Sequence, residues 1–273
     1  MKDRQDLKIS FNTANFAFRQ VGYKATGDWG QACRTSREHY SDVETFEKRF
    51  DEMLGEVDAF GFKAVELWHF HLHQKWWTDR HVEIALSVAR RRGMKFVAYC
   101  GGFGDDLPEF ERTLGLVNAL GIDVLAGASK VFFEKRASFV ERLRHHEVRF
   151  AYENHPEKTP AEHLQKIGGD EDVVGATVDT GWYGSQNYPA DRALLELRSR
   201  LMHVHLKDVS EIGKHDTCGF EKGVVPIRAC IETLRGFGFE GYVSVEHEPD
   251  QFDPTPDLHD ARAFVNQVLE VTT

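Results

Sequence analysis

Short apolar runs alternate with amphipathic stretches along the whole chain. Strand-like runs rich in β-branched and aromatic residues occur at 7–16, 64–70, 95–102, 122–129, 148–155, 173–182, 202–209 and 242–248. Stretches with apolar residues at helical spacing follow them, at 44–62, 79–93, 107–121, 134–147, 159–169, 190–201, 227–241 and 257–272. The pattern therefore predicts eight strand–helix units, which implies parallel strands joined by right-handed crossovers.

The number of units and the chain length together favour one fold class. Eight units within 273 residues, with no break in composition, predict a single α/β domain over residues 1–273, folded as a (β/α)₈ TIM barrel. The competing fold is a doubly wound open sheet, which usually carries a glycine-rich phosphate loop after its first strand. The sequence FNTANFAFRQVG at that place is not such a loop. We therefore predict the barrel, with its chemistry at the carboxyl ends of the strands.

Two strand-to-helix connections are longer than usual, at residues 17–43 and 209–226. In a barrel both would lie on the catalytic face, where long loops commonly act as lids or binding loops. We expect Trp29, which stands among Gly22, Gly27 and Gly30, to close over a ligand. The alternative is that both segments are surface loops without a functional role.

Composition and charge exclude several classes of protein. No apolar run approaches the roughly 20 residues that cross a bilayer, and the charged amino terminus lacks the apolar core of a signal peptide. The four cysteines form no closely spaced pair, and the net charge of −10 comes with no basic block longer than ARRRG at residues 89–93. We therefore expect a cytoplasmic protein that binds neither membrane nor nucleic acid.

Four polar residues stand at the ends of the last four predicted strands: Glu153, Asp179, His205 and Glu246. Alternation places each carboxylate on the same face as a small residue, which would point into the mouth of the barrel. Three carboxylates so close would repel one another unless a cation neutralised them. This donor set predicts one divalent metal ion, with Mn²⁺ expected first and Mg²⁺, Co²⁺ or Zn²⁺ as alternatives. The opposing interpretation is four separate, solvated strand ends.

The same segments carry a family resemblance. The motifs YENHPEKTP, VDTGWY, HVHLKD and GFEGYVSVEHEP resemble those of the sugar phosphate isomerase/epimerase superfamily, the xylose isomerase-like barrels. The resemblance implies that Glu153, Asp179, His205 and Glu246 are metal ligands. It also implies that Glu153 and Glu246 form the acid/base pair that acts on opposite faces of a ketose.

The resemblance implies a divalent-metal-dependent isomerase or epimerase that moves a proton through a cis-enediolate of a sugar, ketose or polyol-derived ketone. A metal ion that chelates a carbonyl and its adjacent hydroxyl would acidify the intervening C–H. Loss of a β-hydroxyl at the same site would instead make the protein a lyase, either a keto-inositol-type dehydratase or a C-glycoside-cleaving enzyme. A non-catalytic sugar-binding protein is the third hypothesis. The partners expected are the sugar and either further copies of the chain or a small partner subunit.

One position departs from the family pattern. Members that bind three metal ions, the apurinic endonucleases, carry a histidine three residues after the strand-six aspartate, and many sugar epimerases do so as well. This chain has Trp182 there. The departure and the acidic charge argue against a DNA-repair nuclease, and we assign Trp182 to substrate binding.

Further candidates for substrate binding are His155, Lys207, Trp68 and His71. His155 and Lys207 share a strand face with Glu153 and His205 respectively, and their alternative roles are a loop histidine and a salt bridge to Glu153 or Asp208. Trp68 and His71 belong to the aromatic segment ELWHFHLHQKWW, whose rings could stack on a sugar or simply pack in the core. In the same regions, Glu66 could orient a histidine, and we expect His203 to be a supporting or core residue.

Overall fold

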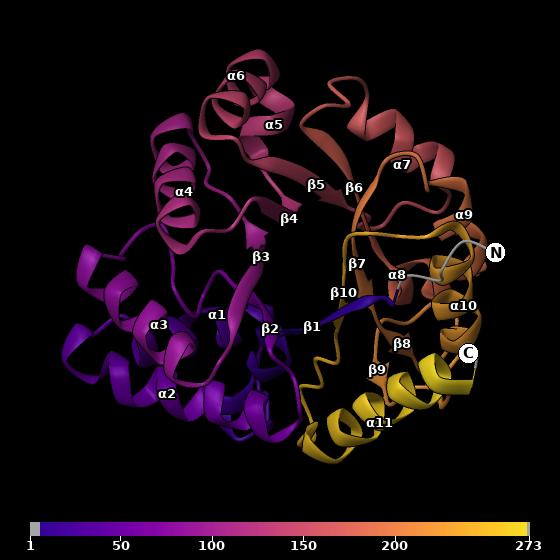
Figure 1. Ribbon diagram of the computed structural model, residues 1–273, viewed down its shortest axis with the longest axis horizontal. Helices are drawn as coiled ribbons and strands as arrows, with labels where there is room; N and C mark the ends of the chain where they lie inside the picture. Colours follow the sequence, from indigo (N-terminus) through magenta and orange to yellow (C-terminus); the bar gives the residue numbers. More distant parts are fainter. Residues whose placement is uncertain (1–5, 272–273) are drawn as a thin grey trace.

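Eight parallel strands close into a barrel in the computed structural model, which describes residues 6–271 (Figure 1). They are β1 (Lys8–Asn12), β2 (Ala64–Trp68), β3 (Lys95–Gly102), β4 (Val124–Ala128), β5 (Arg149–Glu153), β6 (Val174–Asp179), β7 (Leu201–Leu206) and β10 (Tyr242–Val245). Around the ring the order is β1-β10-β7-β6-β5-β4-β3-β2, so strands that follow one another in the barrel series are neighbours. The predicted TIM barrel is confirmed.

Helices surround the barrel (Figure 1). Those of the strand–helix units are α2 (Val43–Ala59), α3 (Asp79–Arg91), α4 (Leu107–Leu120), α6 (Arg136–His146), α7 (Pro160–Ile167), α9 (Ala190–Glu196), α10 (Ile227–Phe237) and α11 (Thr255–Val271). Their ends follow local capping chemistry. The Thr159 hydroxyl accepts the Glu162 N–H at 3.3 Å before α7, and Gly121 ends α4 in the left-handed conformation with φ of 72°.

The connections between these units hold further short elements. Residues 13–40 form the 3₁₀ helices η1 (Thr13–Phe16) and η2 (Arg19–Val21) and then the helix α1 (Trp29–Tyr40). The short helices α5 (Lys130–Glu134) and α8 (Thr180–Ser185) follow β4 and β6, and β8 (Asp208–Val209) pairs antiparallel with β9 (Thr217–Cys218) after β7. The sequence predicts a long loop over residues 17–43, and this prediction is wrong for Trp29–Tyr40. Instead α1 forms because Ala32, Ser36 and Tyr40, spaced four apart, bury one face of it.

The barrel interior changes character along its axis. At the level of the strand starts, Ala98, Val124 and Ala151 pack together, and Met202 lies against them. Above this layer buried polar side chains appear, beginning with the Ser10 and Ser244 hydroxyls, which are hydrogen-bonded at 2.7 Å. The small apolar layer closes the floor of the barrel, so buried polar groups are concentrated toward the carboxyl ends of the strands.

Two sequence expectations concern the chain ends and the membrane. The charged residues 1–5 and residue 272 of the last expected helix lie outside the described residues. Within residues 6–271, none of the helices combines the length and apolar character that crossing a membrane requires.

Candidate functional site

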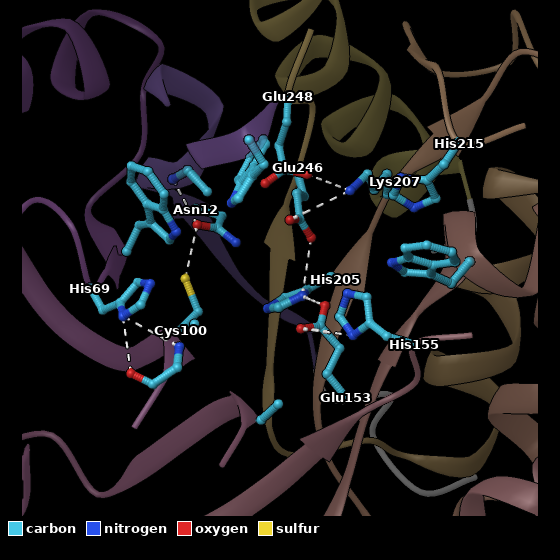
Figure 2. Close-up of a pocket in the computed structure, with 17 residues that line it drawn as sticks. Asn12, His69, Cys100, Glu153, His155, His205, Lys207, His215, Glu246 and Glu248 are labelled. Atoms are coloured by element: carbon cyan, nitrogen blue, oxygen red, sulfur yellow. Dashed lines mark hydrogen bonds and ion pairs between the residues drawn. The ribbon is translucent and has the colours of Figure 1, made fainter. Parts of the chain in front are cut away.

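Glu153, Asp179, His205 and Glu246 come together at the carboxyl ends of four adjacent strands, β5, β6, β7 and β10. Each offers one ligand atom, and these four atoms all lie within 4.8 Å of one another. All four side chains are buried. Glu153, His205 and Glu246 are seen converging in Figure 2. The cluster predicted from the strand ends is therefore present as a set, and its geometry matches a site for one metal ion.

The two ring nitrogens of His205 face different partners. Nδ1 lies 2.5 Å from Glu153 Oε1 and 3.1 Å from Glu246 Oε2, inside the cluster. Nε2 lies 3.0 Å from Glu66 Oε1 on the opposite side of the ring. An Nε2–H that donates to Glu66 leaves the Nδ1 lone pair directed at the other ligands, which is the tautomer that a metal site requires.

Two buried carboxylate oxygens of the cluster accept no hydrogen bond from any described residue: Asp179 Oδ2 and Glu246 Oε2. For Asp179 the other oxygen is satisfied, because Oδ1 accepts the N–H groups of Gly181 at 2.7 Å and Trp182 at 3.1 Å. Glu246 Oε2 lies in ion-pair range of His205 without hydrogen-bond geometry. A buried carboxylate oxygen without a partner is costly, and a cation between these two would satisfy both. The residues present therefore fit a divalent metal ion.

Asn154 fixes the end of β6 beneath this aspartate. Its Oδ1 accepts the Asp179 N–H at 2.8 Å, and its Nδ2 donates to the Asp179 carbonyl at 3.0 Å. Asp179 also begins α8 as its N-cap, so backbone and side chain are both held. Neighbouring hydrogen bonds therefore fix the orientation of Asp179 Oδ2.

The electrostatics of the cluster show the same need for positive charge. Burial raises the pKa of Asp179 and raises the pKa of Glu246 well above its usual range. Burial also acts to raise the pKa of Glu153, but the charges of His205 and His155 outweigh it and lower that pKa to about 2. For His205 burial lowers the pKa, and the surrounding Glu246, Glu66 and Glu153 raise it well above its usual value. Without a metal ion, the cluster thus holds protons that a cation would replace.

A second buried network supports the cluster from below. Glu66 on β2 is fully buried, and its Oε2 lies 3.1 Å from His203 Nε2. His203 in turn contacts the Ser244 hydroxyl at 3.2 Å. The structure thus places Glu66 as the partner that orients His205, and His203 in a supporting position outside the ligand set.

A cavity of about 420 Å³ opens above the cluster (Figure 2). It is lined by Asn12, Ala14, Trp29, Trp68, His69, Cys100, Gly101, Gly102, Ala128, Glu153, His155, Trp182, His205, Lys207, His215, Glu246 and Glu248. The predicted substrate-binding residues Trp29, Trp68, His155, Lys207 and Trp182 are all among them. Both long connections reach this cavity, because one contributes Trp29 and the other His215. They therefore lie on the face that carries the cluster, as the sequence predicted.

His71 is the exception among the predicted residues. Its ring is fully buried against Tyr40 and Trp68 and does not line the cavity. His69 lines the cavity instead, and its ring occupies the space above Gly101, where a Cβ would lie 2.4 Å from His69 Cδ2. The chain turns after Trp68, with the His71 N–H bonded to the Trp68 carbonyl at 2.9 Å, so strand alternation no longer applies there.

Lys207 is buried among carboxylates. Its Nζ lies 2.5 Å from Glu248 Oε2, 3.6 Å from Asp179 Oδ2 and 3.7 Å from Glu246 Oε1. Burial lowers its pKa, but Glu246 and Glu248 outweigh this and keep the pKa well above its usual value. The salt bridge to Glu153 or Asp208 that we weighed from the sequence is not formed. Asp208 instead accepts backbone N–H groups within the 209–226 connection.

Besides His69, four cavity residues with polar side chains were not identified from the sequence: Asn12, Cys100, His215 and Glu248. Asn12 and Cys100 lie at strand ends, so the end-of-strand rule used for the ligands could have found them. Nothing in the local pattern singles out His215, whose ring stacks on Trp182 at 3.8 Å between centroids. The atoms Asn12 Nδ2, Trp182 Nε1 and His215 Nε2 are buried and have no hydrogen-bond partner among the described residues.

A model of the family described as xylose isomerase-like TIM barrel matches residues 54–268. Among curated proteins, no sequence is significantly similar to this chain.

Solved structures with the same fold include enzymes of more than one reaction class. A D-tagatose 3-epimerase-like protein superposes with a TM-score of 0.69 at 13% identity, covering 97% of this chain and 98% of that one. A probable 3-DHS dehydratase, AsbF, from Bacillus anthracis superposes with a TM-score of 0.63 at 15% identity, covering 95% of this chain and 99% of that one. A xylose isomerase-like TIM barrel protein from Mycobacterium smegmatis in complex with magnesium superposes with a TM-score of 0.67 at 15% identity, covering 99% of each chain. At these identities the likeness concerns the fold.

Proposed function

The chain belongs to the xylose isomerase-like TIM barrel family, and on that premise we propose that it is a divalent-metal-dependent isomerase or epimerase of a sugar or related polyhydroxy ketone. The observation that carries the proposal is the placement of Glu153 and Glu246. They come from β5 and β10, which are separated by two strands in the ring, yet both carboxylates approach the same nitrogen, His205 Nδ1, at 2.5 and 3.1 Å. Two proton-transferring groups thus flank a single position.

The metal ion would be held by Glu153, Asp179, His205 Nδ1 and Glu246, and we expect Mn²⁺ before Mg²⁺, Co²⁺ or Zn²⁺. A divalent ion bound there would polarise the carbonyl and neighbouring hydroxyl of a substrate as a Lewis acid. The magnesium in the Mycobacterium smegmatis protein supports a hard divalent ion in this fold.

The two glutamates would carry the proton. One carboxylate removes the proton from the carbon next to the substrate carbonyl, and the other returns a proton from the opposite side. Return to the same carbon inverts it and gives an epimer, whereas return to the adjacent carbon gives an isomer. The Lys207 ammonium, 3.7 Å from Glu246 Oε1, would stabilise the ionised form of that glutamate. Trp29, Trp68 and Trp182 line the cavity around the reacting carbons and would limit the access of water.

A lyase reaction on the same site is the second candidate, and His155 is the observation that favours it. Its Nδ1 lies 3.8 Å from Glu153 Oε2, and its ring meets Trp182 edge-on in the cavity. Loss of a β-hydroxyl or of an aglycone needs an acid to protonate the leaving group, and in this candidate reaction His155 would be that acid.

The test is incubation of Mn²⁺-loaded protein with a panel of ketoses and of C-glycosides in D₂O. Solvent deuterium in a recovered epimer or isomer is the result we expect. Loss of water or of an aglycone would assign the lyase reaction instead. Binding of sugars without any exchange or product would overturn both and leave a sugar-binding protein.

A further inference from the structure

The charge of the cavity points to a class of substrate. Lys207 is the one lysine or arginine that lines the cavity among the described residues, and it is already paired with Glu248. Around it stand four carboxylates, those of Glu153, Asp179, Glu246 and Glu248. A divalent ion together with the lysine would still leave these four carboxylates with an excess of one negative charge.

The approach to the cavity is acidic as well. A second cavity of about 470 Å³ shares Trp29, Lys207, His215 and Glu248 with the first and extends toward the long connections. It is lined by Phe18, Gly27, Asp28, Trp29, Lys207, His215, Asp216, Thr217, Glu248, Pro249, Asp250, Gln251 and Phe252. Asp28, Asp216 and Asp250 are exposed along it, and no arginine lines it in the described part of the chain. An anion entering this way would meet repulsion at the rim and again at the metal site.

Apart from the candidate ligand Glu246, the cavity residues that hold a buried polar atom without a hydrogen-bond partner among the described residues are neutral. Asn12 is fully buried with its Nδ2 unpaired, and Trp182 Nε1 and His215 Nε2 are buried and unpaired as well. Burial together with the Lys207 and His155 charges lowers the pKa of His215 to about 2, so this ring is uncharged. Such groups pair with hydroxyl or carbonyl oxygens, and the indole of Trp182 adds an apolar face for a sugar ring.

We infer that the substrate is an uncharged polyhydroxy ketone, free of phosphate and carboxylate groups, held through its hydroxyls by Asn12, Trp182 and His215. The inference rests on the proposed function for the position of the metal ion and deepens it by naming the substrate class. It separates this chain from barrels that act on sugar phosphates or on acidic ketones, because those substrates need a cation that is free to pair with them.

Matched ligands test the inference by calorimetry on the Mn²⁺-loaded protein. For each ketohexose (D-fructose, D-tagatose, D-sorbose and D-psicose) the neutral sugar is compared with its 6-phosphate, and D-fructose also with D-fructuronate. We expect the best neutral sugar to bind at least about 10-fold more tightly than its anionic counterparts at 0.01 M salt. The difference in affinity between the neutral and the anionic ligands should become smaller at 1 M salt. The electrostatic screening length is about 30 Å at 0.01 M salt and about 3 Å at 1 M.

Two sets of variants separate charge from shape. Asp28→Asn/Asp216→Asn/Asp250→Asn should strengthen binding of the 6-phosphate several-fold and leave the neutral sugar unchanged. The matched control Glu141→Gln/Glu232→Gln/Glu240→Gln removes three exposed carboxylates outside both cavities and should change neither. Trp182→Phe keeps an aromatic ring, a phenyl in place of the indole, but removes the N–H, and should weaken neutral-sugar binding by about 2- to 13-fold.

Tighter binding of a 6-phosphate or of D-fructuronate than of the neutral sugar would overturn the inference. So would the failure of every neutral sugar to bind. Binding of a neutral sugar without deuterium exchange in D₂O would instead uphold the substrate class and overturn the proposed reaction, so the two claims fail separately.

Discussion

The two halves of the barrel end in different chemistry. The strands β5, β6, β7 and β10 supply all four candidate metal ligands, and the ring order places these strands side by side. The strands β1–β4 supply an amide, an indole, a thiol and small residues to the cavity: Asn12, Trp68, Cys100, Gly101, Gly102 and Ala128. One half thus carries all four candidate ligands and, in the proposed function, the proton transfer, whereas the other supplies only uncharged groups from its strands to the cavity wall. The difference teaches that the wall formed by β1–β4 can be changed without touching the candidate metal ligands.

The largest expected effect lies in the half that carries charge. Glu153→Gln and Glu246→Gln keep the side-chain size but remove the base, and each should lower turnover by about 10²- to 10⁴-fold. The measurement is steady-state kinetics with the substrate found in the ketose panel, together with metal content. Near-normal turnover in either variant, with the metal ion bound, would remove that glutamate from the reaction and break the division between the halves.

Glu66 is the place where the two halves meet, because it belongs to β2 and yet holds His205 Nε2 at 3.0 Å. Glu66→Gln should weaken Mn²⁺ affinity by about 10- to 100-fold, because the amide no longer favours the tautomer that presents Nδ1. The affinity is measured by titration calorimetry on metal-free protein. Ser244→Ala is the control, because it removes the contact to His203 and leaves that to His205 intact. Equal loss of affinity in both variants would contradict the specific role of Glu66.

Trp29 tests the recognition side. It is 41% exposed and stands edge-on to Trp68, with ring centroids 5.7 Å apart, at the cavity wall. Trp29→Ala should raise KM by about 2- to 10-fold, the value of one lost aromatic contact, with metal content unchanged. Phe133→Ala, at a 53% exposed ring outside the cavity, is the control and should leave KM unchanged. Unaltered kinetics in the Trp29→Ala variant would show that Trp29 does not contribute to substrate binding.

The smallest effect concerns His71, which packs behind the cavity wall. Burial, with Arg19 and His39, lowers its pKa from 6.5 to about 3. The unfolded chain therefore binds the extra proton first as the pH falls below 6.5, so this histidine stabilises the fold at neutral pH and loses that contribution toward pH 3. Between pH 7 and pH 5 the loss is about 1–2 kcal/mol.

His71→Phe should flatten the unfolding free energy over that pH interval by this amount and leave metal content unchanged, as measured by urea unfolding. Replacement of the exposed His145 by Gln is the control, with no such flattening expected. A pH profile identical to that of the parent protein would show that His71 is not the group responsible.

The same contrast explains how far the sequence predicted the structure. The barrel follows from local periodicity, and the four ligands follow from alternation near strand ends, since a strand's inward face is fixed once its period is known. Alternation failed where the strand had already ended, as between His69 and His71. The helix α1 was missed because only Ala32, Ser36 and Tyr40 mark its buried face. His215 depends on the path of a long connection, which no local pattern encodes.

The partners of the charged side chains could also not be predicted from the sequence. A salt bridge from Lys207 to Glu153 or Asp208 was the alternative to a role in substrate binding, but the closest carboxylate to Lys207 is that of Glu248, from another strand end. A lysine can pair with any of several nearby carboxylates. The tertiary structure decides the choice, through differences in distance of a few ångströms. The Glu66 contact to His205 was foreseen only as an orienting role, because it crosses the barrel between β2 and β7.

The central claim is that the half with the charged strand ends binds one divalent ion. The most direct test is an anomalous difference map from crystals of the protein grown with Mn²⁺. The account predicts a single strong peak bonded to Glu153, Asp179, His205 Nδ1 and Glu246. A map without a peak at these side chains, or one whose peak is held by Glu66, His203 and His205 Nε2 instead, would contradict it.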